Sequence, residues 1–293
     1  MTIPSARRWT AAAACLLLLA AASRPCVAQG RPLFAADPVW DDGKAEVDLY
    51  RAEETLYGEK RSFEARMIVV KEDMREDLKV KSETGPIPGK TREVLKLNHL
   101  RRVPAGAYED YEMLSVLLDR ASLRVLKLTM SHFESCGATF LQILPQPGSL
   151  LHISHSYWDG EGDRTIKIPF SEEDLLADAL PLQLRALDFR RAARRDVKML
   201  PSQISGRVQA LAPIPATLAV SGPERVEVPA GRFQAYRVEI ARTGAKDRYY
   251  FEVDSPHRLL EMETGAGSVY RLRKSLRLDY WNHHRNGEEK LLE

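Results

Sequence analysis

The sequence predicts a mainly β protein: a large, curved antiparallel sheet or open half-barrel, with a short helical segment near residues 171–190. Two observations predict this class. Apolar and polar residues alternate with a period of two in many short stretches, which is typical of strands that bury one face. Turns containing Gly or Pro separate these stretches, which favours antiparallel hairpins. With 293 residues and 44% hydrophobic content, the chain is long enough to bury its own core.

The strands fit either a single β-rich domain or two β lobes. The lobes would be residues 43–168 and 203–281, joined by a helical connector over residues 171–195. Val103–Tyr111 and Val228–Tyr236 share the pattern V-P-A-G-x-aromatic-x-x-Y. Either the lobes arose by duplication, or the same turn chemistry occurs twice.

The first 28 residues have the pattern of an export signal. Arg7 and Arg8 precede an unbroken apolar stretch from Ala11 to Ala22, and small residues stand before a cleavage position after Ala28. The stretch is shorter than the roughly 20 residues that span a bilayer. We therefore expect a Sec-type signal peptide and a periplasmic or secreted mature chain, residues 29–293, without a transmembrane span.

Removing the signal changes both the charge and the cysteine content. Residues 1–28 contain three arginines and no acidic residue, so the formal net charge changes from +2 to −1. A nearly neutral chain gives no support for nucleic-acid binding. Cys15 and Cys26 are removed with the signal, which leaves Cys136 without a partner for an internal disulfide. We expect Cys136 to be buried, because a free cysteine behaves as a small apolar residue.

The N-terminal half is expected to consist of strands. Val47 and Leu49 alternate with polar neighbours, and so do the apolar residues of Phe63–Val69. Both stretches are expected to be half-buried strands joined by a turn at Tyr57–Lys60. Residues 114–118 also fit a helical turn. Further strands are expected around Val94–Leu97, Tyr108–Leu118, Leu123–Thr129, Phe140–Leu144, Ser149–Ser156 and Thr165–Ile168.

The clearest helix is expected from Ser171 to Phe189. Ser171 is a good N-cap, and Asp174 occupies the capping-box position three residues later. Pro181 ends or kinks this helix, or stands in the first turn of a second stretch. The arginines within 185–195 are expected on a solvated helix end; the alternative is a docking surface for anionic lipid heads or an acidic partner.

The C-terminal part returns to β structure. A hairpin is expected around the Pro229–Gly231 turn, followed by strands around Tyr249–Val253 and Leu260–Glu263. The last strand is expected to carry its apolar residues on one face and its arginines on the other. The apolar residues are Tyr270, Leu272, Leu276, Leu278 and Tyr280, and the arginines are Arg271, Arg273 and Arg277.

Several runs, mostly in the first half, resemble a family of exported bacterial proteins of unknown function with a β-rich domain. They are Asp42–Glu46, Tyr57–Glu59, Val69–Asp73, Val94–Asn98, Lys127–Ser131, Glu134–Gly137, Ser156–Asp163, Val228–Phe233 and Tyr250–Glu252. Some members carry an automatic label as septum formation inhibitors of the Maf type. Maf enzymes are cytosolic α/β proteins with a Ser-Pro-Arg-Arg start motif, which this sequence lacks. The resemblance implies a compartment and a fold class, and no catalytic residues.

Five residues are the candidates for a site: His132, Glu134, Cys136, His155 and Asp159. The first three alternate along the chain, so on a strand they would share one face and would suit a Cys–His nucleophile or a metal pair. Side chains four residues apart on a strand are, however, too distant for a cysteine and its base. A packed turn or strand end is therefore the expected structure around these three residues.

Two further patterns are weaker. His152 and His155 are three residues apart, and on a strand they point to opposite faces. The acids of Asp159–Asp163 resemble the start of a calcium loop, but an EF-hand needs Gly where Arg164 stands and Glu where Phe170 stands. A hairpin turn is the expected structure, with an improvised calcium site as the alternative.

The sequence contains none of the specific motifs of zinc sites, and no P-loop, G-x-S-x-G or G-x-G-x-x-G motif. We therefore assign no catalytic residue, no metal and no cofactor. The leading hypothesis is an exported cell-envelope protein that is not an enzyme and binds a lipid or other apolar or amphipathic ligand, or an envelope protein partner. This requires a cavity.

Two alternatives remain open. A hydrolase with an unfamiliar Cys/His site requires the candidate side chains to converge in one cleft. An envelope scaffold or assembly subunit requires an exposed apolar patch or an unpaired sheet edge.

Overall fold

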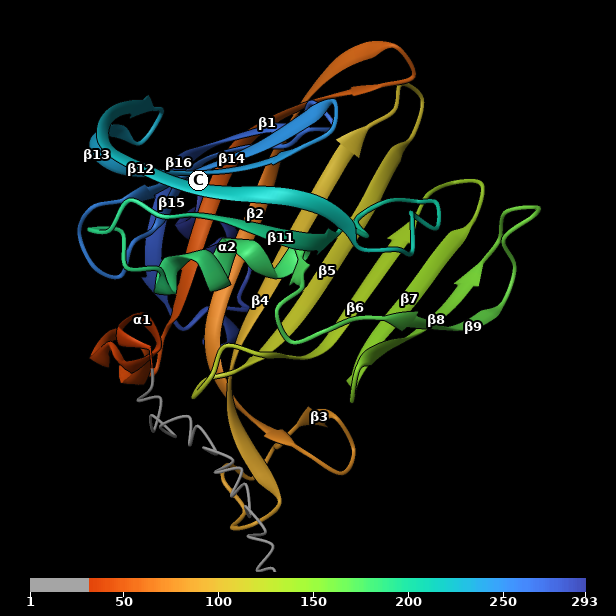
Figure 1. Cartoon of the computed structure of the whole chain (residues 1–293), viewed down its shortest axis with the longest axis horizontal. Helices are drawn as coiled ribbons and strands as arrows, with labels where there is room; N and C mark the ends of the chain where they lie inside the picture. Colours follow the sequence, from red (N-terminus) through yellow and green to blue (C-terminus); the bar gives the residue numbers. More distant parts are fainter. Residues whose placement is uncertain (1–31) are drawn as a thin grey trace, which may run out of the picture.

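A computed structural model describes residues 32–293, which form one large β-sheet with short helical turns (Figure 1). The signal peptide predicted over residues 1–28 lies outside this range. Sixteen strands are present in the described part of the chain. Their bounds are β1 Ala45–Leu56, β2 Glu59–Arg75, β3 Val80–Lys81, β4 Thr91–Pro104, β5 Glu109–Asp119, β6 Val125–Phe133, β7 Ala138–Gln146, β8 Ser149–Ser156, β9 Arg164–Pro169, β10 Leu175–Leu176, β11 Arg194–Leu200, β12 Ile214–Val228, β13 Gly231–Arg242, β14 Ala245–Glu252, β15 Leu259–Glu263 and β16 Val269–Leu278.

The strand order confirms the predicted fold class. Across the sheet the order is β10–β11–β12–β13–β14–β15–β16–β1–β2–β4–β5–β6–β7–β8–β9, and β3 pairs with β2 at the side. All of these pairs are antiparallel except β10 with β11. The end strands β9 and β10 do not pair with each other, so the sheet stays open. Because β1 pairs with β16, residues 43–168 and 203–281 share this one sheet.

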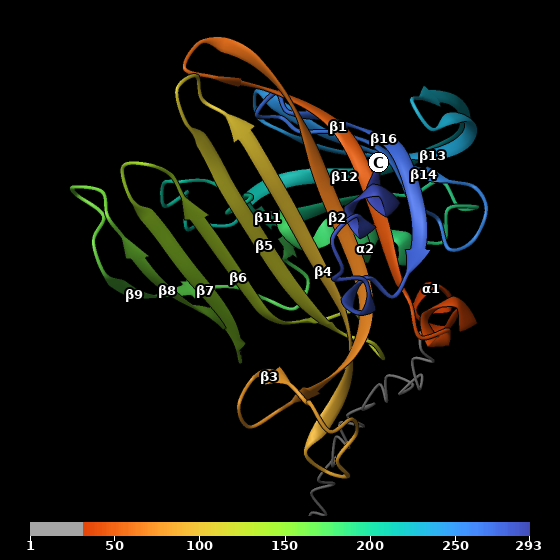
Figure 2. The same cartoon turned by 180° about the vertical axis from the view of Figure 1, so that it is seen from behind.

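The sheet curves, and its C-terminal strands lie over its N-terminal strands. In Figure 1, β11 and β12 cross in front of β2, β4 and β5, and Figure 2 shows the same arrangement from behind. The side of β4 and β5 that faces β11 is called the inner face below. The helical segments are α1 Leu33–Ala36, η1 Pro38–Asp41, η2 Ala177–Ala179, α2 Leu180–Gln183, η3 Leu184–Ala186, η4 Tyr280–Asn282 and η5 Glu288–Leu292. Within residues 32–293, no helix has both the length and the apolar character needed to cross a membrane.

The β1–β2 turn and the strand over residues 114–118 are as expected, whereas the helix expected from Ser171 is wrong. Tyr57 and Gly58 form the β1–β2 turn with positive φ angles of 52° and 78°, and residues 114–118 continue β5 with no helical turn. The helix expected from Ser171 begins only at Ala177. The backbone N–H of Ser171 donates to Asp174 Oδ2 at 2.7 Å, which closes a local turn. Strand β10 follows this turn, so residues 171–176 are not helical.

The first residues of β1 are buried on both faces, although a half-buried strand was expected. Val47 and Leu49 pack against Leu276 and Leu278 on the outer side. On the other side, Glu46 is only 3% exposed. Tyr280 and Leu292, which follow the last strand, thus pack on one face of β1, and Arg185 of the helical connector lies on the other, which a local sequence pattern cannot reveal.

The partner of Glu46 is Arg185, which was expected on a solvated helix end. Arg185 is buried, and its guanidinium donates two hydrogen bonds to the Glu46 carboxylate at 2.6 and 3.0 Å. It also donates from Nε to the carbonyl of Pro256 at 2.8 Å. The arginines that follow, among them Arg191, remain exposed.

The last strand does not keep its apolar residues on one face. Leu272 pairs with Tyr50 and Lys274 pairs with Leu49, so Arg273 is an extra residue in β16. A bulge of this kind reverses the side on which later residues point. Leu272 therefore packs in the main core, whereas Leu276 packs on the outer side of β1.

Candidate functional site

The inner face of β5 changes from apolar to acidic along the strand. Leu114, Val116 and Leu118 are buried in the main core. Asp110 and Glu112 continue the same face at positions two residues apart, and both are buried as well. Buried carboxylates need compensating partners, so the neighbours of these two residues define what this end of the sheet can do.

The partners of Glu112 come from the neighbouring strands. The β-sheet register places Arg101 of β4 and His132 of β6 directly opposite Glu112 on either side. Arg101 Nε lies 3.2 Å from Glu112 Oε2, and the same guanidinium binds Glu54. His132 Nδ1 lies 3.4 Å from Glu112 Oε1, which is long for a hydrogen bond. Burial opposes ionisation of Glu112, but the charge of Arg101 and the neighbouring His132 hold its pKa below the usual range.

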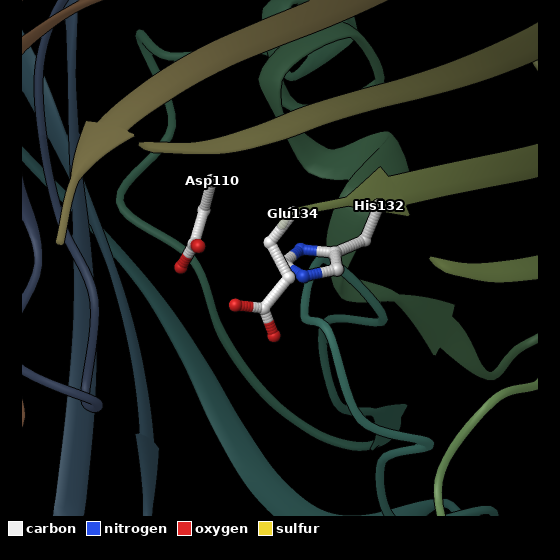
Figure 3. Close-up of side chains that lie close together, drawn as sticks. All are labelled: Asp110, His132 and Glu134. Atoms are coloured by element: carbon white, nitrogen blue, oxygen red, sulfur yellow. The ribbon is translucent and has the colours of Figure 1, made fainter. Parts of the chain in front are cut away.

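Asp110, His132 and Glu134 form the tightest group of potential ligands in the described chain. One ligand atom from each residue lies within 4.8 Å of the others. Figure 3 shows the two carboxylates and the imidazole directed toward the same space. Burial raises the pKa of the Asp110 carboxyl, and Glu134 adds to this effect. Burial favours the neutral form of His132, but the neighbouring carboxylate of Glu112 and the charges of Asp110 and Glu134 raise its pKa.

The segment between β11 and β12 covers this group. Thr139 Oγ1 of β7 and Trp158 Nε1 each donate a hydrogen bond of 2.8 Å to the carbonyl oxygen of Gly206. Gly206 lies against the ring of His132, so close that no side chain fits there. The segment around Gly206 is therefore packed onto the inner face directly beside His132.

Of the sequence candidates, the structure brings together only His132 and Glu134. Cys136 lies exposed in the turn between β6 and β7, so the expected burial was wrong. His155 and Asp159 are also exposed, and His155 Nδ1 faces Asp163 at 3.1 Å. A free cysteine at a hairpin turn has no neighbouring core to bury it, whatever its intrinsic preference.

The sequence analysis missed Asp110 and Glu112. They lie on a different strand, about 20 positions before His132, and only the β5–β6 register brings them together. A signal was nevertheless present. The period-two pattern of Leu114 and Val116 extends backwards to Glu112 and Asp110, which places two acids on a core-facing surface.

A cavity of about 450 Å³ opens at the opposite end of the same strands. It lies between the β5–β6 and β7–β8 turns and the chain that leads into α2. Most of its wall is apolar. The apolar lining residues are Val125, Leu126, Pro145, Pro147, Leu150, Phe170 and Leu176.

Four of the charged residues around this cavity are engaged in ion pairs, and a fifth, Asp174, accepts a hydrogen bond from the backbone N–H of Ser171. Arg124 forms a bidentate ion pair with Glu172 at the mouth of the cavity. Arg92 pairs with Glu76 at 3.1 Å and lies 3.6 Å from Asp119. The cavity therefore presents an apolar interior without a free charge of its own at these positions.

Two polar atoms in the cavity lining have no hydrogen-bond partner within residues 32–293. They are Oγ of Ser149, a residue only 4% exposed, and Oε1 of Gln183. Both atoms are buried. Burying such an atom without a partner costs about 1–3 kcal/mol, and a polar group that reached either oxygen from the cavity would relieve this cost.

The convex face of the same strands exposes large apolar side chains. Met113, Phe133 and Phe140 are all substantially exposed. The ring of Phe133 stacks on Tyr111 with a centroid distance of 4.9 Å. This aromatic surface lies on the side of β5 and β6 opposite to Asp110 and His132.

No protein-family model, curated protein or solved structure matches this chain.

Proposed function

We propose that this is an exported protein that binds an uncharged amphipathic small molecule in the cavity at the β5–β6 end of the sheet. The single observation that carries the proposal is a mainly apolar cavity of about 450 Å³ whose lining residues include Ser149 and Gln183, each with a buried oxygen that has no hydrogen-bond partner within residues 32–293. Export rests on the signal-like pattern of residues 1–28.

The cavity size supports a small-molecule ligand. Ligand pockets in proteins typically have volumes of about 300–1,000 Å³ and combine apolar walls with a few placed polar groups. The walls around Leu150 and Phe170 supply the apolar part. Burial of an apolar ligand body against them supplies roughly 25 cal/mol per Å² of apolar area removed from water.

The polar groups define the chemistry of the ligand. Gln183 Oε1 is an amide oxygen and can only accept a hydrogen bond. Gln183 Nε2 donates to the carbonyl of Leu123 at 2.9 Å, which fixes the orientation of the amide. Ser149 Oγ can donate or accept. The charged residues at the mouth, Arg124 and Glu172, already neutralise each other. A ligand with an apolar body and a hydroxyl, amide or amine N–H group fits this set, and it needs no net charge.

A fluorescence titration tests the proposal. N-phenyl-1-naphthylamine is an uncharged apolar molecule with one N–H donor, and its emission rises in an apolar site. We expect saturable binding to the purified chain at one site. Val125→Phe narrows the cavity and should weaken binding at least about tenfold. Met113→Phe changes an exposed residue of the convex face and should leave binding unchanged.

The opposite pattern would contradict the proposal. Equal affinity in Val125→Phe and the wild-type chain would place the probe outside the cavity. Loss of binding in Met113→Phe alone would place it on the convex aromatic face. Both variants should keep the circular dichroism spectrum of the wild-type chain, which separates a local effect from unfolding.

A further inference from the structure

We infer that Asp110, His132 and Glu134 form a binding site for one divalent transition-metal ion, with Zn²⁺ as the ion that fits best. This site lies at the other end of the strands from the ligand cavity. It uses residues of β5 and β6 and the turn that follows β6. The inference is independent of the proposed ligand binding.

The distances between the ligand atoms fit a shared ion. One atom from each of the three residues lies within 4.8 Å of the other two. Zinc bonds to nitrogen and carboxylate oxygen are about 2.0–2.2 Å long, which separates the ligands of a tetrahedral ion by roughly 3.5 Å. A small inward movement of the two carboxylates in Figure 3 therefore completes the coordination.

Unpartnered buried atoms point to a ligand at this place. Asp110 is 8% exposed and His132 is 4% exposed. Asp110 Oδ1, His132 Nδ1 and Glu134 Oε2 are all buried, and none has a hydrogen-bond partner in the described part of the chain. Buried polar atoms are normally satisfied. A cation that binds two carboxylates and an imidazole gives all three of these atoms a partner at once.

The local charge favours a cation. Four carboxylates meet at this end of the inner face, those of Glu54, Asp110, Glu112 and Glu134. Arg101 forms ion pairs with both Glu54 and Glu112. His132 is the basic group that faces the remaining two carboxylates. The group therefore has excess negative charge in a largely buried position, where a divalent ion is strongly attracted.

The donor set selects the type of ion. Imidazole nitrogen favours zinc and its transition-metal neighbours, whereas magnesium and calcium prefer oxygen ligands alone. One imidazole with two carboxylates is a zinc-type set that leaves a fourth position for water. Glu112 Oε1 lies 3.4 Å from the same nitrogen, His132 Nδ1, so this carboxylate adds negative charge beside the ion.

The ion has a route from solvent. Glu134 is only half-buried, and it also lines a surface hollow together with Tyr108, Phe133 and Ser135. An ion that enters beside Glu134 reaches Asp110 and His132 directly behind it. Once bound, the ion links β5, β6 and the turn that holds Glu134, so it stabilises this end of the sheet.

Isothermal titration of ZnCl₂ into the purified, chelator-treated chain tests the inference. We expect one zinc ion per chain at this site. Asp110→Asn, His132→Gln and Glu134→Gln, each made singly, should weaken its affinity at least about tenfold, because each removes one ligand. The shapes of these side chains change little, so the fold should be retained.

Two control variants address other histidines near carboxylates. His283 faces Asp279 at 3.3 Å and Glu288 at 3.0 Å at the exposed C-terminus. His155 faces Asp163 at 3.1 Å. A variant with His283→Gln and His284→Gln, and the single variant His155→Gln, should bind zinc with wild-type affinity.

X-ray absorption of the zinc-loaded wild-type chain gives a second test that needs no variant. The expected spectrum has one imidazole, oxygen ligands and no sulfur. Two or more imidazoles, or a sulfur ligand from Cys136, would overturn the inference. So would the absence of zinc binding, or unchanged affinity in all three ligand variants.

Discussion

A Cβ atom on Gly206 would lie 2.6 Å from Nε2 of His132, so the backbone of the β11–β12 segment touches the histidine directly. The φ angle of Gly206 is outside the left-handed region, and alanine is therefore acceptable to the backbone there. The three atoms nearest to such a Cβ all belong to the imidazole of His132. The contact couples the covering segment to the inner face of the sheet.

Gly206→Ala should therefore displace His132. We expect a loss of about 1–3 kcal/mol in the free energy of unfolding, which is typical of an overpacked interior, and weaker zinc binding. Urea unfolding and zinc titration measure the two effects. Wild-type stability together with wild-type zinc affinity would show that the ring and the segment move apart freely.

Arg185→Met should strongly destabilise the fold. The substitution leaves Glu46 buried without its cation, and breaking a buried ion pair in this way costs about 3–5 kcal/mol. The matched control is Arg191→Met, because Arg191 pairs with Asp188 at 3.2 Å on the exposed surface. Surface pairs contribute little, so urea unfolding should show a large loss only for Arg185→Met.

Asp178 should make stability depend on pH. Burial raises the pKa of this carboxyl to about 6 from an ordinary value of 3.8, although Ser202 and the N–H of Gln203 donate hydrogen bonds to it. The folded chain then holds a proton that the unfolded chain has lost between these pH values. The contribution of Asp178 to the free energy of unfolding therefore falls as pH rises from about 4 to about 6, by about 3 kcal/mol.

Asp178→Asn provides the measurement. The difference in unfolding free energy, wild type minus variant, should decrease over this interval and stay constant at higher pH. A difference that is independent of pH from 4 to 7 would contradict a raised pKa for Asp178.

Ser149→Ala separates stability from ligand binding. Its Oγ is buried without a partner in the cavity, so the alanine variant should be at least as stable as the wild-type chain without ligand. Its affinity for N-phenyl-1-naphthylamine should fall, since one hydrogen-bonding position is lost. Thermal unfolding and the fluorescence titration measure the two effects.

The control is Ser154→Ala. Ser154 Oγ is equally buried and unpartnered within residues 32–293, but Ser154 does not line the cavity. This variant should keep both the stability and the probe affinity of the wild-type chain. An equal loss of affinity in both variants would show that Ser149 acts through the general structure of β8 and makes no direct contact with the probe.

Local patterns predicted the strands, because alternation and turn residues act over a few positions. Tyr57 and Gly58 are one example, and the path of β5 is another. The burial of Glu46 could not be predicted in this way, because its partner Arg185 stands 139 positions later. The bulge at Arg273 likewise depends on how β16 pairs with β1, which the sequence of β16 alone does not specify.

The candidate sites were also predictable only where their residues are close together in the sequence. His132 and Glu134 were recognisable because they stand at alternate positions along the sequence, although Glu134 lies in the turn just after β6. Asp110 joins them only through the β5–β6 register. The cavity depends on two separate turns and on the chain that leads into α2, so its lining residues have no common local pattern.

Native mass spectrometry of the chain, purified gently from a bacterial periplasm, tests the central claim most directly. The proposed ligand binding predicts a stoichiometric excess mass that organic extraction removes and that is absent in Val125→Phe. An unliganded mass for the wild-type chain, together with no saturable binding of N-phenyl-1-naphthylamine, would contradict it.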